Sequence, residues 1–116
     1  MTLISIEADK TSISKRFRKA DYFAFLKDGK VNIIKNEHKT SKSNEFFEYF
    51  NTLGIERIYV KELGYKTFLK LQALKVAVYF VQDVEKFSDI ETNNLLLLNE
   101  HNAEDLCTLG HHKPAT

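Results

Sequence analysis

The dipeptide Asp28-Gly29 lies between two short apolar runs, and it constrains the fold of this chain more than any other local feature. Both residue types tolerate the positive backbone φ angles of a two-residue turn, so the pair predicts a tight β-hairpin. The run before the turn covers residues 21–27, and the run after it covers residues 30–35. We therefore expect an antiparallel pair of strands in the first third of the chain.

Three further strands are expected from short runs that are rich in β-branched residues. They cover residues 3–8, 55–60 and 75–81. Strand-helix-strand crossovers join parallel neighbours, so these strands and the hairpin predict an α/β fold with a five-stranded mixed sheet. The sheet should be mostly parallel, with the strand at 21–27 running against the others and helices on both faces.

Three helices are expected between and after these strands. Phenylalanines at helical spacing in residues 46–53 predict the first, and Gly54 follows where a glycine commonly ends a helix. A second helix is expected after Gly64. A third is expected to begin at Asp83, whose carboxylate can cap free backbone N–H groups, and to run toward the leucines at 95–98.

The size and composition of the chain predict one globular domain. Its 116 residues, with 43% hydrophobic and 28% charged, match an ordinary globular mixture and leave room for a single core. Seventeen basic against sixteen acidic residues leave a formal charge of +1, which excludes a strong overall field for nonspecific nucleic-acid or membrane-surface binding. We expect residues 1–98 to form the domain and residues 99–116 to form a flexible C-terminal tail.

The chain shows none of the sequence signals of export or membrane insertion. Its first twenty residues lack the apolar segment of a signal peptide, and the leucine run at 95–98 is far shorter than the ~20 residues that span a bilayer. The single cysteine, Cys107, forms no internal disulfide. A cytoplasmic protein is expected.

Residues 14–20 concentrate positive charge in an otherwise neutral chain, and we call them the basic loop. Four cations occupy five positions: Lys15, Arg16, Arg18 and Lys19. Fixed cations and backbone N–H groups at the carboxyl end of a strand can hold an anion. Lys39 and Lys42, after the strand at 30–35, are expected to border the same rim. The alternative is an ordinary solvated surface.

Cys107, His111 and His112 form a second group of chemically capable residues. Thiolate and imidazole are suitable ligands for iron, copper or zinc, and a turn at Gly110 would let the three side chains converge. Structural zinc motifs, in contrast, present two separated pairs of ligands. A tail with incidental histidines is therefore the alternative.

Three segments also carry a resemblance to a known family. Residues 14–23 are similar to the loop S-x-H-F-G-R-A-x-Y-F. Residues 54–76 are similar to a segment in which a strand that begins with G-[IV] is followed by G-x-x-[AS]-F, a helix and [IV]-x-V-Y. Residues 83–86 are similar to a helix start with the sequence T-V-E-E. In this order they resemble the dinitrogenase iron-molybdenum cofactor biosynthesis family, the small NifX/NafY-like accessory proteins linked to nitrogen fixation. The resemblance spans roughly residues 3–98. Arg16 stands where the family has its loop histidine, and Arg18 where it has a glycine.

The resemblance implies a ribonuclease H-like fold and a non-catalytic carrier or accessory that binds an anionic iron-sulfur or iron-molybdenum cluster or its precursor. Its implied partners are cluster-donor or acceptor proteins. The cluster would lie at a rim of cofactor-binding residues, with three metal ligands closing over it. The rim residues are Ser14, Arg16, Phe17, Arg18, His38 and Gly64, and the ligands are Cys107, His111 and His112.

Two other functions stay open, and enzymatic activity is not expected. The replacements at Arg16 and Arg18 favour a protein-interaction or regulatory module of the same fold that has lost the cluster. Nucleic-acid binding through the basic loop is less favoured and predicts a steep salt dependence. The chain has no G-x-x-x-x-G-K-[ST], G-x-G-x-x-G or G-x-S-x-G motif, and Glu7 and Asp9 alone are too few carboxylates for two-metal nuclease chemistry.

Overall fold

The Asp28-Gly29 turn forms the hairpin that the sequence predicts. The computed structural model describes residues 1–107, in which β2 (Tyr22–Lys27) and β3 (Lys30–Lys35) are antiparallel neighbours. Asp28 and Gly29 have φ angles of 52° and 77°, as a type I′ turn requires. The right-handed twist of the two strands matches this turn, which fixes their register.

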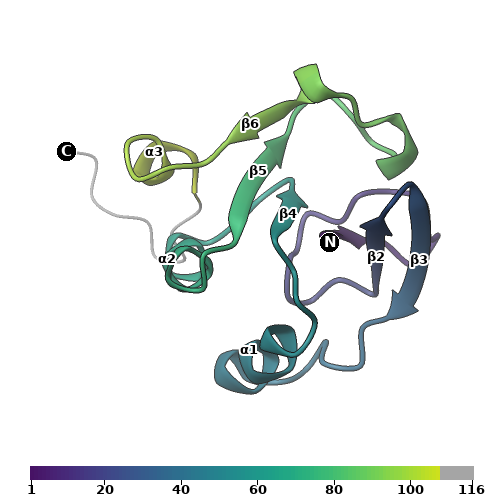
Figure 1. Ribbon diagram of the computed structural model, residues 1–116, viewed down its shortest axis with the longest axis horizontal. Helices are drawn as coiled ribbons and strands as arrows, with labels where there is room; N and C mark the ends of the chain where they lie inside the picture. The colour runs from purple at the N-terminus through teal and green to yellow at the C-terminus, as the bar shows by residue number, and fades with distance from the viewer. Residues whose placement is uncertain (108–116) are drawn as a thin grey trace.

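The hairpin forms one end of a mixed sheet in the order β3-β2-β1-β4-β5-β6 (Figure 1). The central strands β1 (Thr2–Ile6), β4 (Arg57–Val60) and β5 (Ala77–Val81) are parallel neighbours. β2 runs against β1, and β6 (Leu95–Leu97) runs against β5. The expected α/β fold with a mixed sheet is confirmed, but the sheet has six strands where five were expected.

The expectation that an α-helix begins at Asp83 is wrong. The leucines toward which this helix was expected to run form the sixth strand instead. Asp83 has a φ of 61°, outside the right-handed helical region, and only two 3-10 turns follow, η1 (Phe87–Asp89) and η2 (Thr92–Asn94). The leucine run pairs with β5, where the N–H of Leu98 donates to the carbonyl of Val78 at 2.8 Å. The free edge of β5 thereby gains main-chain partners.

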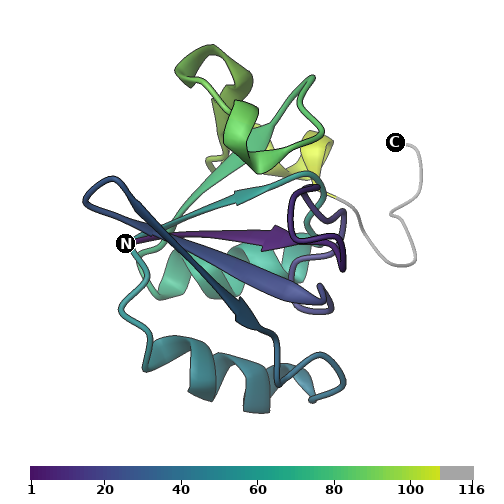
Figure 2. The ribbon, with the colours of Figure 1, turned by 90° about the vertical axis from the view of Figure 1, so that its right-hand side faces the viewer.

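The three α-helices within residues 1–107 cover one face of the sheet. The expectation that helices cover both faces is therefore wrong for the α-helices. They are α1 (Ser43–Asn51), α2 (Tyr65–Ala73) and α3 (Ala103–Leu106), and each buries side chains in one core cluster. The other face is covered by the loop with Ile13 and by the segment with Val84 and Phe87. Figure 2 shows α1 and α2 below the sheet and the 3-10 turns above it.

Residues 99–107 pack against the domain, although they were expected to belong to a tail that begins after residue 98. Ala103 is fully buried and Cys107 is 6% exposed, and both belong to the core cluster under the helices. Packing therefore extends beyond the expected boundary, and residues 108–116 lie outside the described part. Within that part, every helix is too short or too polar to cross a membrane.

Candidate functional site

The basic loop lies at the carboxyl edge of the sheet, between the ends of β1 and β4. These strands are parallel neighbours, but the chain leaves β1 toward β2 and leaves β4 through α2 toward β5. In open α/β sheets, ligands bind outside the carboxyl ends of the strands where such connections diverge. Figure 2 shows β1 and β4 pointing toward this edge, with the loop following β1 in purple.

Buried polar side chains hold the backbone of the basic loop. Ser5, on β1, donates from its Oγ to the carbonyl of Phe17 at 2.9 Å. Ser14 accepts the N–H of Arg16 on its Oγ at 3.0 Å. Both serines are at least 96% buried, and together with Asn36 they are all of the buried polar residues within residues 1–107. Each of these three buried side chains therefore bonds the backbone of the basic loop.

Among these three buried side chains, Asn36 makes the most hydrogen bonds. Its Nδ2 donates to the carbonyls of Arg18 and Ala20 at 2.8 and 2.9 Å, and its Oδ1 accepts the N–H of His38 at 2.9 Å. Its own backbone N–H donates to the carbonyl of Asp21 at 3.0 Å. One side chain at the end of β3 therefore ties the loop after β1 to the loop after β3.

Phe17 anchors the basic loop in the core. Its side chain is 5% exposed and packs edge-to-face against Phe46 at 5.4 Å and Phe50 at 5.9 Å between ring centroids. Edge-to-face aromatic pairs add to the free energy gained from burial. The loop is therefore fixed from below by an aromatic ring and within its backbone by hydrogen bonds.

The cations of the basic loop point outward and form no ion pair with any described residue. Lys15, Arg16 and Lys19 are exposed and Arg18 is half-buried. The ion pairs within residues 1–107 belong to the chain N-terminus, Lys39 and Lys61. Like charges on a rigid loop repel one another, so an anion bound among them relieves an unfavourable interaction.

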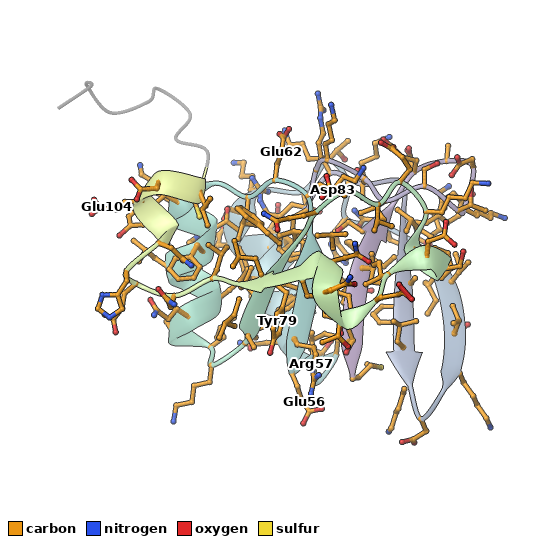
Figure 3. All side chains as sticks on the ribbon, turned by 90° about the horizontal axis from the view of Figure 1, so that it is seen from above. Glu56, Arg57, Glu62, Tyr79, Asp83 and Glu104 are labelled. Carbon is orange, nitrogen blue, oxygen red and sulfur yellow. The ribbon has the colours of Figure 1, made fainter. Side chains whose placement is uncertain are left out.

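A cavity of about 470 Å³ opens between the basic loop and the start of α2. Its walls are Lys15, Arg16, Phe17, Arg18, Lys19, Glu62, Leu63, Gly64 and Thr67. Glu62 is the only acidic residue among them, so the lining is strongly positive. Figure 3 shows Glu62 at this edge of the molecule and Arg57 at the opposite edge.

Gly64 begins α2 at the floor of this cavity. As the N-cap residue it has no side chain to bond the first turn, so the N–H groups of that turn lack a side-chain cap. The positive end of the helix dipole favours an anion at such a position. The cavity therefore combines cationic side chains with the backbone N–H groups at the start of a helix.

A smaller cavity of about 300 Å³ lies on the other side of the basic loop. It shares Lys15, Arg16 and Lys19 with the first, and it adds Glu7, Ser14, Asp21 and Lys39. Lys39 forms an ion pair with Asp21. Its lining holds two carboxylates, so the larger cavity is the better site for an anion. Lys42, expected at the same rim, lines neither cavity.

His38 is not brought to either cavity. Its ring stacks on Tyr49 of α1 with 4.2 Å between ring centroids, and its Nδ1 lies 3.2 Å from the Oγ of Ser41. Of the six residues expected to bind a cofactor, the larger cavity is lined by Arg16, Phe17, Arg18 and Gly64, and the smaller by Ser14 and Arg16. His38 instead helps to order the loop after β3.

Cys107 lies in the core beneath the helices. Burial raises the pKa of its thiol to about 11, so the group stays protonated near neutral pH, whereas a metal ligand must be a thiolate. His111 and His112 lie outside the described residues, so the three-ligand group stays a prediction. Within residues 1–107, no three His, Cys, Asp or Glu side chains are grouped to hold a metal ion.

The cations of the basic loop are evident in the sequence, but the residues that hold their backbone are not. Ser5 and Asn36 bond positions 12 to 18 residues away in the chain, and no local pattern signals such contacts. Asn36 begins a polar stretch and therefore has the local character of an ordinary loop residue. Glu62 and Thr67 were missed because their place in the cavity depends on how β1 and β4 pair.

Comparisons with known proteins place the fold among solved structures. No protein-family model and no curated protein matches the sequence. The apo form of the orange protein from Desulfovibrio gigas has a similar structure, with a TM-score of 0.56 and 18% identity over 68% of this chain and 72% of that chain. A Thermotoga protein of the DUF35 family, provisionally named a NifB protein, has a TM-score of 0.54 and 24% identity, over 70% and 75%. At these identities, the similarity shows a shared fold.

Proposed function

We propose that this protein is a non-catalytic carrier or accessory that binds an anionic iron-sulfur or iron-molybdenum cluster, or its precursor, in the cavity beside the basic loop. The observation that carries the proposal is the hydrogen-bonded backbone of this loop. It presents four cations that form no ion pair within residues 1–107, beside the start of α2, whose first turn has no side-chain cap. Sulfide-rich clusters carry negative charge and suit such a site. A volume near 470 Å³ is in the usual range of small-ligand sites.

Each part of the site has a distinct task in this proposal. Arg16 and Arg18 supply charge and hydrogen bonds to the cluster, and the N–H groups after Gly64 supply donors at a fixed position. Phe17 and Leu63 form an apolar wall that limits access of water. Charge and hydrogen bonding thus hold the cluster, and His111 and His112 remain candidates for direct ligation.

The two structural neighbours support this proposal by their names. One is the apo form of the orange protein, a term for a protein without its bound group, and the other is named after NifB. The same proposal includes a ribonuclease H-like fold and kinship with the NifX/NafY-like accessory proteins. It also includes a cytoplasmic location and exchange of the cluster with donor or acceptor proteins.

Anaerobic reconstitution tests the proposed cluster site. The purified protein is offered iron and sulfide, or a molybdenum-sulfide anion, and the metal it retains is measured after gel filtration. Arg16→Ala with Arg18→Ala is expected to weaken binding roughly a hundredfold, because each charged hydrogen bond contributes at least about 1.5 kcal/mol. A Cys107→Ala, His111→Ala, His112→Ala triple variant measures direct ligation in the same assay.

The matched control removes the same charge from the opposite edge of the sheet. Lys27 and Arg57 are both exposed there, and Lys27→Ala with Arg57→Ala should retain the metal as the wild type does. Equal retention by both double variants, or no retention by the wild type, would contradict the proposed site. A short oligonucleotide, titrated at low salt, tests the nucleic-acid alternative.

A protein-interaction module that has lost the cluster is the second candidate function. Its supporting observation is that residues 1–107 hold no group of metal-ligating side chains, and that Cys107 lies in the core. A partner complex isolated from the native source distinguishes the two functions. If it survives exhaustive metal removal and the Arg16→Ala, Arg18→Ala change, the interaction function is favoured.

A further inference from the structure

β3 is an edge strand with unusually exposed apolar side chains. All six of its residues are exposed, and among residues 1–107 it has β2 on one side and no strand on the other. Val31 is 51% exposed, Ile34 42% and Ile33 36%, and these are half of the exposed large hydrophobic residues within residues 1–107. Long apolar edge strands promote pairing with another strand, so their exposure calls for an explanation.

The outer edge of β3 offers a regular row of main-chain donors and acceptors. Lys27 and Lys30 close the hairpin opposite one another, and the N–H of Asn36 bonds the carbonyl of Asp21. In an antiparallel ladder this alternation directs the even-numbered residues of β3 toward β2. The N–H and C=O groups of Val31, Ile33 and Lys35 therefore point away from the sheet, toward a further strand.

An apolar cavity of about 380 Å³ adjoins this edge on the face that carries the α-helices. It is lined by Met1, Phe25, Lys27, Asp28, Lys30, Asn32, Ile34 and Leu53. α1 ends at Asn51, and Leu53, just after it, lines the cavity together with Ile34. Ile34 therefore stays exposed to solvent. On the opposite face, Val31 and Ile33 are open as well, so both faces of one strand present apolar surface.

We propose that a second copy of this chain pairs with β3 in an antiparallel, two-fold arrangement, so that one continuous sheet runs through both copies. The charges of β3 permit this occupant. Lys30 and Lys35 are five positions apart and lie on opposite faces of the sheet, so a two-fold antiparallel pairing never places one opposite the other. The formal charge of +1 adds little repulsion between the copies.

One register uses the apolar side chains best. With Asn32 opposite Asn32 of the second copy, Val31 of each copy lies opposite Ile33 of the other. This register brings four β-branched side chains together on one face of the joint sheet. On the other face, Ile34 lies opposite Lys30, whose aliphatic stem covers it. β6 at the other edge of the sheet is half as long, and Leu95 and Leu96 are partly covered, which favours β3 as the paired edge.

This assembly is independent of the cluster proposal. In a two-fold antiparallel pair the strands of the two copies run in opposite directions. The two basic loops, which follow the carboxyl ends of the strands, therefore lie on opposite sides of the joint sheet, and each copy keeps a complete cavity. The β3 seam uses none of the residues that line the larger cavity. Loss of the dimer and loss of anion binding are therefore expected from different variants.

Sedimentation velocity with the full chain tests the pairing, at concentrations up to about 1 mM, where even a millimolar Kd gives substantial dimer. The wild type is expected to approach twice the 13.5 kDa mass of one chain. Val31→Lys and Ile33→Lys should each raise the dimer Kd more than about tenfold, because a buried seam disfavours an unpaired charge. Leu69→Lys changes an equally exposed leucine on α2 and should leave the dimer intact.

Oxidative cross-linking tests the register and does not depend on changing an apolar residue. Even-numbered residues of β3 form the non-hydrogen-bonded pairs of the seam, whose Cα atoms are about 4.5 Å apart, within the range for a disulfide. Asn32→Cys should therefore give a covalent dimer on mild oxidation, whereas Leu69→Cys and the wild type with buried Cys107 should not.

Three results would overturn the pairing of β3 with a second copy. One is a wild type that stays monomeric over the whole concentration range. Another is a dimer that survives both lysine substitutions on β3 but is lost with Leu97→Lys on β6. The third is an Asn32→Cys variant that cross-links no faster than Leu69→Cys. Circular dichroism confirms that each variant is folded.

Discussion

The basic loop and the segment that ends at Cys107 carry the two groups of candidate functional residues in the sequence. The fold exposes the cations of the loop to solvent and buries the thiol of Cys107. In the loop, Ser14 and Phe17 face inward while the cations face solvent. At Cys107 the reactive atom itself faces the core. The same domain therefore exposes one group of functional side chains and buries part of the other.

The difference shows what a functional residue needs besides the right chemical type. The loop cations are available because hydrogen bonds from buried side chains and an aromatic anchor hold their backbone, so the charged ends face solvent. Cys107 has the right element for a metal site, but its burial favours the protonated thiol. Each of the following changes tests one side of this difference.

The largest effect is expected from Phe17→Ala. Removing a buried phenylalanine typically costs about 3–5 kcal/mol of unfolding free energy, because it leaves a cavity among its partners, here Phe46 and Phe50. Urea unfolding measures this loss, and Phe17→Leu should lose clearly less. A loss below about 1 kcal/mol would show that the loop does not depend on its anchor.

Asn36→Ala should cost about 2 kcal/mol of unfolding free energy, because it removes one buried and one partly buried hydrogen bond to the carbonyls of Ala20 and Arg18. Asn51→Ala, at an exposed position, is the matched control and should stay within about 0.5 kcal/mol of the wild type. Anion affinity should fall with Asn36→Ala as well. Unchanged anion affinity would show that binding does not depend on the hydrogen bonds from Asn36 to the basic loop.

A smaller, pH-dependent effect is expected from Cys107. Burial raises the pKa of its thiol from 9.0 to about 11, so between these values the folded chain keeps a proton that the unfolded chain has lost. The stabilisation is fully present below pH 9 and is lost as the pH rises to about 11. Because the pKa of Tyr49 is also raised by burial, both chains lose stability in this range, and the wild type should decline more steeply than Cys107→Ala. Parallel pH profiles would indicate an exposed thiol.

Local sequence patterns predicted the elements that depend on local physics. The Asp28-Gly29 turn and the phenylalanine face of α1 form as expected, because turn chemistry and helical spacing act over a few residues. The leucines of β6 do not follow their local pattern. Their conformation is decided by the open edge of β5, a partner outside the segment.

The candidate site divides in the same way. A run of charges is visible in any sequence, so the cations of the basic loop were found without a structure. The contacts that hold them join Asn36 and Ser5 to distant backbone groups, and the cavity needs α2 to begin beside the loop. These contacts depend on the order of the strands, which local patterns do not specify.

Amide chemical shifts can locate a bound anion residue by residue. The ¹⁵N-labelled protein is titrated with a diamagnetic molybdenum-sulfide anion under anaerobic conditions. If the anion binds at the basic loop, the largest shift changes occur at the amides of residues 15–19 and 64–67, and they disappear in the Arg16→Ala, Arg18→Ala variant. Changes centred on residues 99–107 or on β3, or changes that the double variant retains, would contradict an anion site at the basic loop.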